Sequence, residues 1–450
     1  MADKVFAGSV VLPDRIIENG YVLVGDGAVQ AVGSGAAPEG ERYGGPQFLV
    51  LPGAIDAQVH SRSQLGQEDF IWSTRSAAAG GVTTIVDMPY DDNCLIATAE
   101  RLRAKAREAG AQARVDFALY ATIDPEEGPT RIGELVEAGA CAFKFSTFGT
   151  HPTRFPRIPF HTLYASFQEV GKRGLVAGIH NENDELVRAF LADVEKKGIT
   201  DYTAHGLSRP PIAEAIATAE VYELGAGAGC PVHIVHSSIG RGYELAAAYR
   251  EQGYGATIEA CIHYLTLDEE NEVRRLGGKA KINPPVRPRR EVESLWHHLA
   301  AGNVTVVSTD HVSWSEDRKS DPDMLKNASG VPGLEALYGL LLKGLSERNL
   351  SFSHAARLLA HNPAALFRLT HAKGALEIGR DADIVLMRRD PYRYFAAASG
   401  NNFVSWSPYD GLELPFRAVA TFVRGACVAA DGQVVAEPGQ GRFVSPLRMH

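Results

Sequence analysis

Residues 48–60 read FLVLPGAIDAQVH, and this stretch decides how the middle of the chain folds. It is apolar at consecutive positions, as a strand buried on both faces requires, and it ends on polar side chains. Seven further runs of this kind follow before residue 312: TTIVDMP (83–89), ARVDFALYATI (113–123), ACAFKFS (140–146), LVAGIH (175–180), PVHIVH (231–236), GATIEACIHY (255–264) and NVTVVSTDH (303–311). Eight buried strands favour a closed (β/α)8 barrel over an open sheet.

The segments between these runs have the periodicity of amphipathic helices. The clearest are residues 97–110, 161–174, 213–227, 243–253 and 290–302, and two more, 332–347 and 352–367, follow the eighth run. We therefore predict an α/β protein in which helices cover a barrel of parallel strands.

Both ends of the chain have a different texture, with short strand-like runs and tight turns. Asp26-Gly27 and Asp431-Gly432 each lie between alternating runs, which is the signal of a β-hairpin. We predict that residues 1–52 and 374–450 form one small β-sandwich domain. Residues 53–373 then form the barrel, inserted between the two halves.

Composition excludes several classes of partner. The 450 residues carry 54 acidic and 45 basic side chains, for a formal charge of -9, which disfavours binding to nucleic acid or to an anionic membrane surface. No run approaches the roughly 18 apolar residues of a membrane helix. Five scattered cysteines without a C-x-x-C pair are typical of reduced thiols, and no secretory leader is apparent, so we expect a cytoplasmic protein.

Polar side chains gather at the carboxyl ends of the predicted strands, where barrel enzymes place their active sites. They are three histidines, a lysine and an aspartate: His60, Lys144, His180, His236 and Asp310. Imidazoles and carboxylates are the usual ligands of zinc and similar divalent ions. The pattern therefore predicts a metal centre at one mouth of the barrel.

Two histidines share the sixth run, and only one is expected to face the barrel interior. His233 and His236 are three positions apart, so regular strand alternation would send them to opposite faces. We assign His236 to the site because it lies at the strand end. His233 is then a packing or helix-facing residue.

Lys144 lies between Phe143 and Phe145 on a strand expected to be buried. Desolvation favours a neutral amine, and a neutral lysine reacts with carbon dioxide to give a carbamate that can bridge two cations. Two alternatives stay open, namely an ion pair with a buried acid and a Schiff-base nucleophile in an aldolase-like barrel. The other predicted ligands favour the metal centre.

Several motifs together resemble the cyclic amidohydrolases, a branch of the amidohydrolase superfamily that includes dihydropyrimidinase (hydantoinase), allantoinase and dihydroorotase. The resemblance runs essentially from end to end, and its most specific part is the ordered set HYL (263–265), INPPVR (282–287) and STDH (308–311). It implies a TIM barrel, hydrolysis of a cyclic amide, ureide or imide, a homotetramer, and a bimetal centre, most often of zinc.

The resemblance also implies roles for particular residues. One ion would be held by His60, Lys144 and Asp310, and the other by Lys144, His180 and His236, with Lys144 as the bridging N6-carboxylysine. Asp310 would move a proton from water to the departing ring nitrogen. Asn283 and Ser329 would contact the substrate ring.

The main departure from the family is Gln58, which stands where the pattern His-x-His has its first histidine. A glutamine oxygen is a weaker zinc ligand than imidazole. The chain then binds either one tight ion at Lys144, His180 and His236, or that ion with a weak second one at Gln58, His60, Lys144 and Asp310. The alternative function is a non-catalytic scaffold, as in relatives of dihydropyrimidinase that have lost metal ligands.

Other departures concern the substrate. Hydantoinases place a tyrosine after the lysine, whereas this chain has Ser146 and Thr147 nearby as replacements. Arg62 matches the arginine with which dihydroorotases bind a carboxylate, but Tyr90 stands at the position of its asparagine partner. The polar loop 313–330 after the last strand is either a mobile lid or an ordinary solvated loop, and His263 and His311 are candidates to support the ligands.

Overall fold

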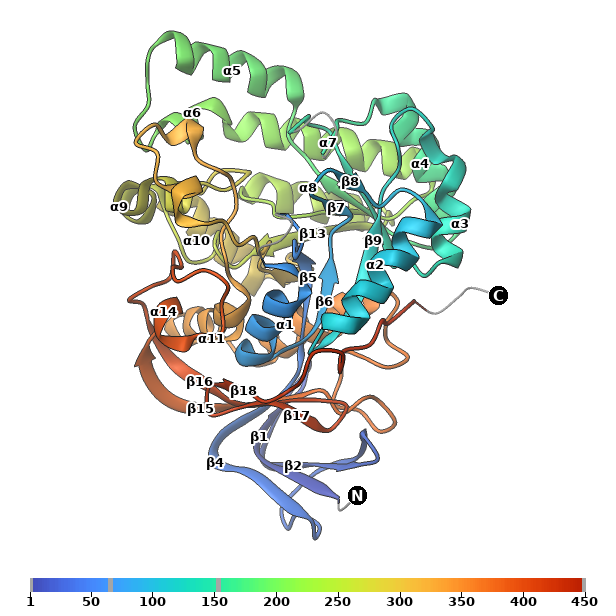
Figure 1. The fold of residues 1–450 in the computed structure, drawn as a ribbon, viewed down its shortest axis with the longest axis vertical. Helices are drawn as coiled ribbons and strands as arrows, with labels where there is room; N and C mark the ends of the chain where they lie inside the picture. Colours follow the sequence, from blue (N-terminus) through green and yellow to red (C-terminus); the bar gives the residue numbers. More distant parts are fainter. Residues whose placement is uncertain (1–2, 64–67, 151–154, 447–450) are drawn as a thin grey trace.

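A computed structural model describes residues 3–63, 68–150 and 155–446, so the limits of the predicted terminal domain at residues 1 and 450 lie outside the described residues. Two eight-stranded sheets organise the chain. One is the barrel of the middle region. The other gathers strands from both ends of the sequence, which lie together below the barrel in Figure 1 in blue and red.

Each of the eight predicted runs contributes one strand to the barrel, and all neighbouring pairs are parallel. In spatial order they are β5 (Ala54–Val59), β6 (Val82–Asp87), β9 (Asp116–Ala121), β10 (Ala142–Ser146), β11 (Ala177–His180), β12 (Val232–Ile234), β13 (Ala256–Cys261) and β14 (Val306–Ser308). The first and last strands meet through a parallel bridge between Val59 and His311, where the His60 amide donates to the His311 carbonyl at 3.0 Å. The barrel prediction is confirmed.

Helices lie outside the barrel, as predicted. Their bounds are α1 (Asp69–Gly80), α2 (Ala99–Gln112), α3 (Ile132–Glu137), α4 (Phe160–Lys172), α5 (Asp184–Lys196), α6 (Ala204–Ser208), α7 (Pro211–Ala228), α8 (Gly240–Glu251), α9 (Arg274–Leu276), α10 (Arg289–Ala300), α11 (Leu337–Glu347), α12 (Ser353–Ala356), α13 (Asn362–Leu366) and α14 (Ala396–Ser399). Side-chain caps start two of them: Thr98 accepts from the Arg101 amide before α2, and Asn183 from the Leu186 amide before α5.

Short elements complete the connections. The 3-10 turns are η1 (Gly128–Arg131), η3 (Gly277–Ala280), η4 (Glu316–Lys319), η5 (Met324–Lys326) and η6 (Leu334–Ala336), the π turns are η2 (Glu269–Val273) and η7 (Arg357–His361), and a small hairpin joins β7 (Tyr90–Asp91) to β8 (Cys94–Leu95). Within the described ranges no helix is both long and apolar enough to cross a membrane.

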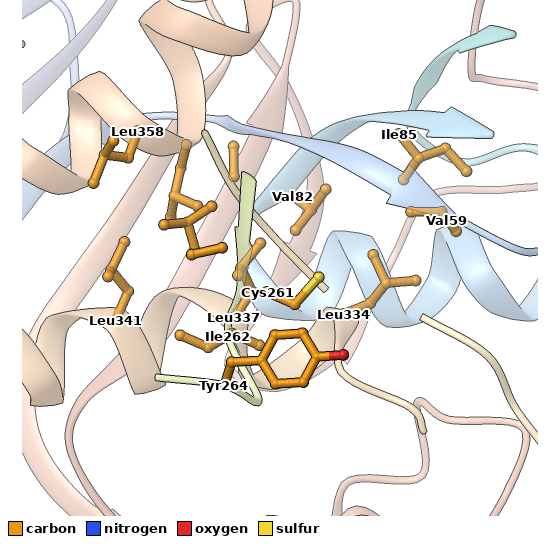
Figure 2. Close-up of a cluster of buried hydrophobic side chains, with 14 of the residues drawn as sticks. Val59, Val82, Ile85, Cys261, Ile262, Tyr264, Leu334, Leu337, Leu341 and Leu358 are labelled. Carbon is orange, nitrogen blue, oxygen red and sulfur yellow. The ribbon is translucent and has the colours of Figure 1, made fainter. Parts of the chain in front are cut away.

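The main core lies between the barrel strands and the surrounding helices. Figure 2 shows one part of it, where Leu334, Leu337 and Leu341 of η6 and α11 gather with Val59, Val82 and Ile85 of β5 and β6. Burying one such aliphatic side chain contributes about 1.5–3 kcal/mol. This packing is what holds the strand ends in fixed positions around the mouth of the barrel.

The terminal sheet has the order β18 (Gln433–Val434), β17 (Ala426–Ala430), β16 (Glu413–Val423), β15 (Ile384–Arg393), β4 (Glu41–Pro52), β1 (Lys4–Val11), β2 (Ile16–Gly25) and β3 (Ala28–Ser34). It folds over its own core, because Phe6 of β1 meets Phe422 of β16 at 4.7 Å between ring centroids although two strands separate them. Both predicted hairpins are present, with positive φ at Asp26-Gly27 and Asp431-Gly432.

A buried ionic joint connects the two sheets. The Lys373 ammonium lies 2.5 Å from Asp116 of β9, 2.9 Å from Asp381 and 2.8 Å from Asp383, and Arg424 also pairs with Asp116. The three carboxylates are close enough together to resemble a metal site. Lys373 already occupies the position between them, and Asp116 begins β9, so the joint lies at the end of the barrel opposite the mouth.

Candidate active site

One cavity at the carboxyl ends of the barrel strands contains the six residues predicted as metal ligands. They are Gln58, His60, Lys144, His180, His236 and Asp310, contributed by β5, β10 and β11 and by the turns after β5, β12 and β14. The other described residues that line it are Ser63, Tyr90, Thr150, Phe155, Asn283, Val312, Trp314, Ser329 and Gly330. The polar residues that the sequence predicts at the strand ends therefore line a single cavity.

Two of these residues enter the cavity through unusual backbone. β12 ends at Ile234 and β14 at Ser308, and His236 and Asp310 then adopt φ of 41° and 48°. Left-handed conformations are uncommon outside glycine, although Asp and His adopt them more readily than most residues, and they are retained where the surroundings hold them. Here the His236 amide donates to Glu259 Oε1 at 3.1 Å, and Asp56 accepts from both the amide and the hydroxyl of Thr309.

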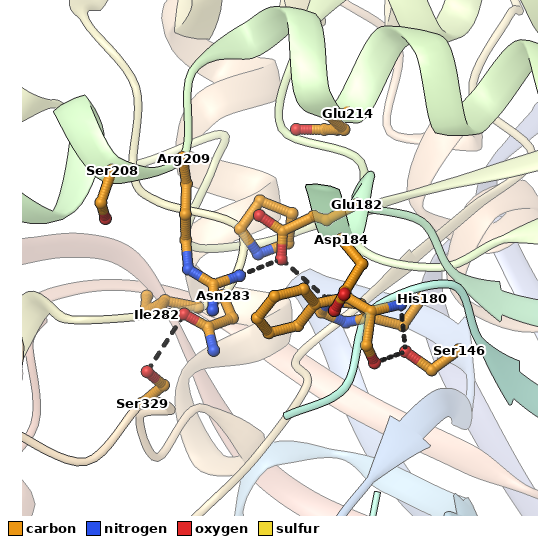
Figure 3. A network of polar contacts seen from close by, with 12 residues as sticks. Ser146, His180, Glu182, Asp184, Ser208, Arg209, Glu214, Ile282, Asn283 and Ser329 are labelled. Carbon is orange, nitrogen blue, oxygen red and sulfur yellow. Dashed lines mark hydrogen bonds and ion pairs between the residues drawn. The ribbon is translucent and has the colours of Figure 1, made fainter. Parts of the chain in front are cut away.

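His180 and His236 form a pair of neutral imidazoles. His180 Nδ1 lies 2.9 Å from His236 Nε2, and His180 Nε2 lies 2.9 Å from Glu182 Oε2, as Figure 3 shows in part. Burial lowers the pKa of both histidines, most strongly for His236. Each neutral imidazole has one ring nitrogen without a proton, and two such rings side by side are suited to binding a single cation.

Glu182 orients His180 from behind. Burial alone would raise its pKa, but the charge of Arg209 and the hydrogen bond with His180 outweigh it and hold the pKa of Glu182 at about 2. Glu182 is therefore ionised and accepts the Nε2 proton of His180, which leaves Nδ1 of that ring without a proton and able to accept. Arg209 pairs with the same carboxylate oxygen.

On the opposite side of the cavity, Asp310 is surrounded by donors. Gln58 Nε2 donates to Asp310 Oδ1 at 2.7 Å, and His60 Nε2 lies 3.4 Å from the same oxygen. Burial works to raise the pKa of Asp310, but His60, His263 and Lys144 outweigh it and the pKa is lowered. Gln58 Oε1 is buried without a hydrogen-bond partner among the described residues, so this oxygen is the atom available to an ion.

Lys144 is fully enclosed between these two groups. Burial lowers its pKa to about 8, against the opposing effects of Asp310, Glu259 and Cys261. Among the ion pairs formed by residues 3–63, 68–150 and 155–446, none includes Lys144, so the structure gives no support to the ion-pair alternative. An amine of this kind is in large part neutral in mildly alkaline solution.

His233 departs from the prediction. Its Nδ1 lies 2.9 Å from Thr257 Oγ1 and its Nε2 3.6 Å from Glu259 Oε2. Glu259 in turn lies near enough to Lys144, across the barrel, for its charge to oppose the fall in the pKa of Lys144. His233 thus faces the interior rather than the helices. Alternation fails as a guide because β12 ends at Ile234, and the positive φ of His236 turns that ring inward as well.

The predicted substrate contacts separate into two groups. Asn283 and Ser329 line the cavity, and the Ser329 hydroxyl donates to Asn283 Oδ1 at 3.1 Å (Figure 3). Ser146 and Thr147 do not line it. The Ser146 hydroxyl donates to the Phe148 carbonyl at 2.6 Å, and the Thr147 hydroxyl donates to the Glu182 carbonyl at 2.9 Å. Both hydroxyls are therefore hydrogen-bonded to the backbone, and neither takes the place of the tyrosine hydroxyl of the hydantoinases.

Arg62 is also outside the cavity lining. Its guanidinium lies 2.5 Å from Glu108 of α2, 3.5 Å from Asp69 and 3.7 Å from Asp91. Three carboxylates therefore neutralise it, and the prediction that it binds a substrate carboxylate is not supported. The sequence could not reveal this, because Glu108 is 46 positions away.

Sequence reasoning missed several cavity residues. Tyr90 begins β7, three residues after the second barrel strand ends at Asp87, so a search of the loops that follow the strands could have found it; its hydroxyl donates to the Lys144 carbonyl at 3.1 Å. Phe155 packs edge-on against Tyr90, with 4.3 Å between the ring centroids. It lies in a loop whose sequence has no strand or helix periodicity. Trp314 is in the predicted lid, and its Nε1 donates to the Ser329 carbonyl at 2.8 Å.

The two histidines predicted to support the ligands differ in their contacts. His311 Nε2 lies 2.7 Å from Glu68 Oε1, and its Nδ1 accepts from the Gly333 amide at 3.1 Å. Its own carbonyl receives the His60 amide, so it supports a ligand through backbone. His263 is buried beside Asp310 and helps to lower the pKa of that carboxyl.

Known proteins resemble this chain over nearly its whole length. A model of the amidohydrolase family matches residues 49–428. The chain is 38% identical to an allantoinase of Rubrobacter xylanophilus over 97% of this chain and 98% of that protein, and 31% identical to an L-hydantoinase of Paenarthrobacter aurescens over 94% of each. The solved structure of an L-hydantoinase (dihydropyrimidinase) from Arthrobacter aurescens matches with a TM-score of 0.91 at 29% identity, covering 99% of this chain and 100% of that one. The chain therefore belongs to the amidohydrolase family, in the branch of the allantoinases and hydantoinases.

Proposed function

We propose that this protein is a metal-dependent hydrolase that opens the ring of a cyclic amide, ureide or imide. The observation that carries the proposal is the grouping of His60, Lys144, His180, His236 and Asp310 around one cavity. The branch to which the chain belongs supports it, because its relatives carry the names allantoinase and hydantoinase. The scaffold alternative has no comparable support, since only position 58 departs from the expected ligand set.

The donor set fits a divalent cation. His180 Nδ1 and His236 Nε2 lie 2.9 Å apart, and His236 Nδ1 and Gln58 Oε1 are buried polar atoms without hydrogen-bond partners among the described residues. Lys144, carboxylated, His180 and His236 would hold the tight ion, and Gln58, His60 and Asp310 would complete a weaker second position with Lys144. Such an ion makes water acidic enough to supply hydroxide near neutral pH and polarises the ring carbonyl.

The residues of the chain move the proton and hold the ring. Asp310 has a lowered pKa and is ionised at neutral pH, so it accepts a proton as water oxygen adds to the ring carbonyl carbon. It then donates that proton to the ring nitrogen as the carbon–nitrogen bond breaks. The product is a linear N-carbamoyl or N-acyl compound with a new carboxylate. Asn283, through its backbone, and Ser329 bind the ring.

The cavity favours a ring without a carboxylate substituent. None of its described lining residues is an arginine, and Arg62 is already neutralised by Asp69, Asp91 and Glu108. Tyr90, Phe155 and Trp314 provide apolar walls. Allantoin and hydantoins therefore fit this proposal better than dihydroorotate. Zinc as the metal and a homotetramer belong to the same proposal and rest on the family resemblance, and a cytoplasmic location rests on the five scattered cysteines without a C-x-x-C pair.

A turnover panel tests this function directly. The purified protein, loaded with zinc in the presence of bicarbonate, is assayed with allantoin, hydantoins, dihydrouracil, dihydroorotate and cyclic imides, and metal content is measured in parallel. Ring opening of a neutral ring with at least one ion per chain supports the proposal. A protein that carries no stoichiometric metal and opens none of the rings would be a scaffold instead, and borohydride trapping of substrate on Lys144 would indicate the aldolase alternative.

A further inference from the structure

Lys319 lies in the loop predicted as a lid, yet its side chain is 1% exposed. Its Nζ donates to three backbone carbonyls, those of Lys281 at 2.9 Å, Ala328 at 2.7 Å and Gly330 at 2.8 Å. All three donors of the ammonium are thereby used. Among the described residues no carboxylate forms an ion pair with Lys319.

The three acceptors have a specific relation to the cavity. Ala328 and Gly330 are the two neighbours of Ser329, and Lys281 is two positions before Asn283. One ammonium group therefore joins the two backbone segments that carry the proposed ring contacts. The same two segments meet again where the Gly330 amide donates to the Lys281 carbonyl at 3.0 Å and the Ser329 hydroxyl to Asn283.

A second lysine extends the connection away from the cavity. The Nζ of Lys281 donates to the Leu325 carbonyl at 2.5 Å and the Asn327 carbonyl at 2.7 Å. The loop is thus anchored from inside by two ammonium groups. Burying an ammonium group without a carboxylate partner costs desolvation free energy. Backbone carbonyls must therefore be held within hydrogen-bonding distance of the group to offset that cost.

We propose that Lys319 is a positioning residue that fixes Ser329 relative to Asn283 and so sets how tightly the substrate ring binds. This rests on the proposed function of the site. Lys319 does not line the cavity and lies outside the proposed metal ligands. Its loss should therefore weaken ring binding while leaving the metal and the proton transfer in place.

The test is steady-state kinetics of the metal-loaded protein with allantoin and hydantoin. Lys319→Met keeps the length of the side chain and removes the three donors. We expect KM to rise by about tenfold or more with kcat changed less than about threefold, the pattern of lost ground-state binding. Lys319→Gln retains part of the donor capacity and should give an intermediate KM. Lys326→Met, on an exposed lysine of the same loop, is the matched control and should leave KM unchanged.

A double-mutant cycle separates positioning from a general loss of structure. If Lys319 acts through Ser329, Lys319→Met combined with Ser329→Ala raises KM no further than the more severe single variant. Additive effects, an unchanged KM in folded Lys319→Met, or a fall in metal content would overturn the inference, as would failure of both Lys319 variants to fold. If the unmodified protein opens no ring, it is the proposed function that fails.

Discussion

The side-chain amide of Gln58 donates a 2.7 Å hydrogen bond to Asp310 Oδ1, so the residue that replaces a family histidine contacts the carboxylate proposed to transfer the proton. Its oxygen, Oε1, has no hydrogen-bond partner within the described part of the chain. Gln58 therefore offers a metal ion one weak, neutral ligand atom, Oε1, while its Nε2 restrains Asp310 through the hydrogen bond. This arrangement favours a single tight ion on the side of His180 and His236.

Gln58→His should restore a second metal position. Imidazole is a stronger zinc ligand than an amide oxygen, so we expect about one additional ion per chain by elemental analysis after dialysis against micromolar zinc. Gln252→His, on the exposed end of α8, is the control for adventitious binding. Equal metal content in Gln58→His and the unmodified protein would contradict a binuclear origin of the site.

Asp310→Asn should separate catalysis from metal binding. The amide cannot accept and return a proton, so kcat should fall by about 10²–10⁴-fold. The ion at Lys144, His180 and His236 should remain. Within the described part of the chain, none of these three residues forms an ion pair with Asp310. Near-normal turnover in a metal-loaded Asp310→Asn protein would remove Asp310 from its proposed role.

Hydrophobic patterning predicted the barrel, because each buried strand must be apolar on both faces and each connecting helix on one. The same pattern could not predict how the chain continues beyond a strand. His233 was misplaced for this reason, since the rule of alternation applies only while the backbone is extended, and the positive φ of His236 lies two residues after β12 ends. The hairpins at Asp26 and Asp431 were predictable because their turn chemistry is local.

Contacts made elsewhere in the fold explain why three predicted substrate-binding residues do not line the cavity. Arg62 matches a carboxylate-binding arginine in its position, but Glu108 on α2 neutralises it. Ser146 and Thr147 have suitable hydroxyls that donate to nearby carbonyls instead. Lys319 donates to backbone only, and backbone acceptors have no signature in the sequence.

Glu182→Gln should weaken metal binding although Glu182 does not line the cavity. A neutral amide can still accept from His180 Nε2, but it removes the negative charge that holds that proton in place, and such changes typically cost 10–100-fold in affinity. Competition with a chelator measures the loss. Glu185→Gln, in the first turn of α5, is the control. An unchanged affinity would show that Arg209 and Glu182 serve packing alone.

Lys144 should make the stability of the metal-free protein depend on pH. Its pKa falls from the ordinary 10.5 to about 8 on folding, so the unfolded chain binds the proton more tightly. Burial of the protonated Lys144 therefore lowers the free energy of unfolding by about 3 kcal/mol below about pH 8, and this destabilisation disappears as the pH rises towards 10.5. Metal-free Lys144→Met should therefore lose part of the rise in thermal midpoint between pH 7.5 and 9.5. Lys172→Met, at an exposed position, should retain it.

Lys373→Met should destabilise the fold without changing the ligands at the cavity. The Lys373 ammonium is 1% exposed and lies within 2.9 Å of Asp116, Asp381 and Asp383, so its removal leaves the buried carboxylates of Asp116 and Asp383 facing each other with Arg424 as their remaining cation. Breaking a buried pair in this way typically costs about 3–5 kcal/mol. Urea unfolding measures the loss, with Lys343→Met on the partly exposed face of α11 as control. Because the joint is at the opposite end of β9 from the mouth, metal content per folded chain should stay constant; if it fell in parallel with stability, the terminal sheet would be part of what holds the metal centre together.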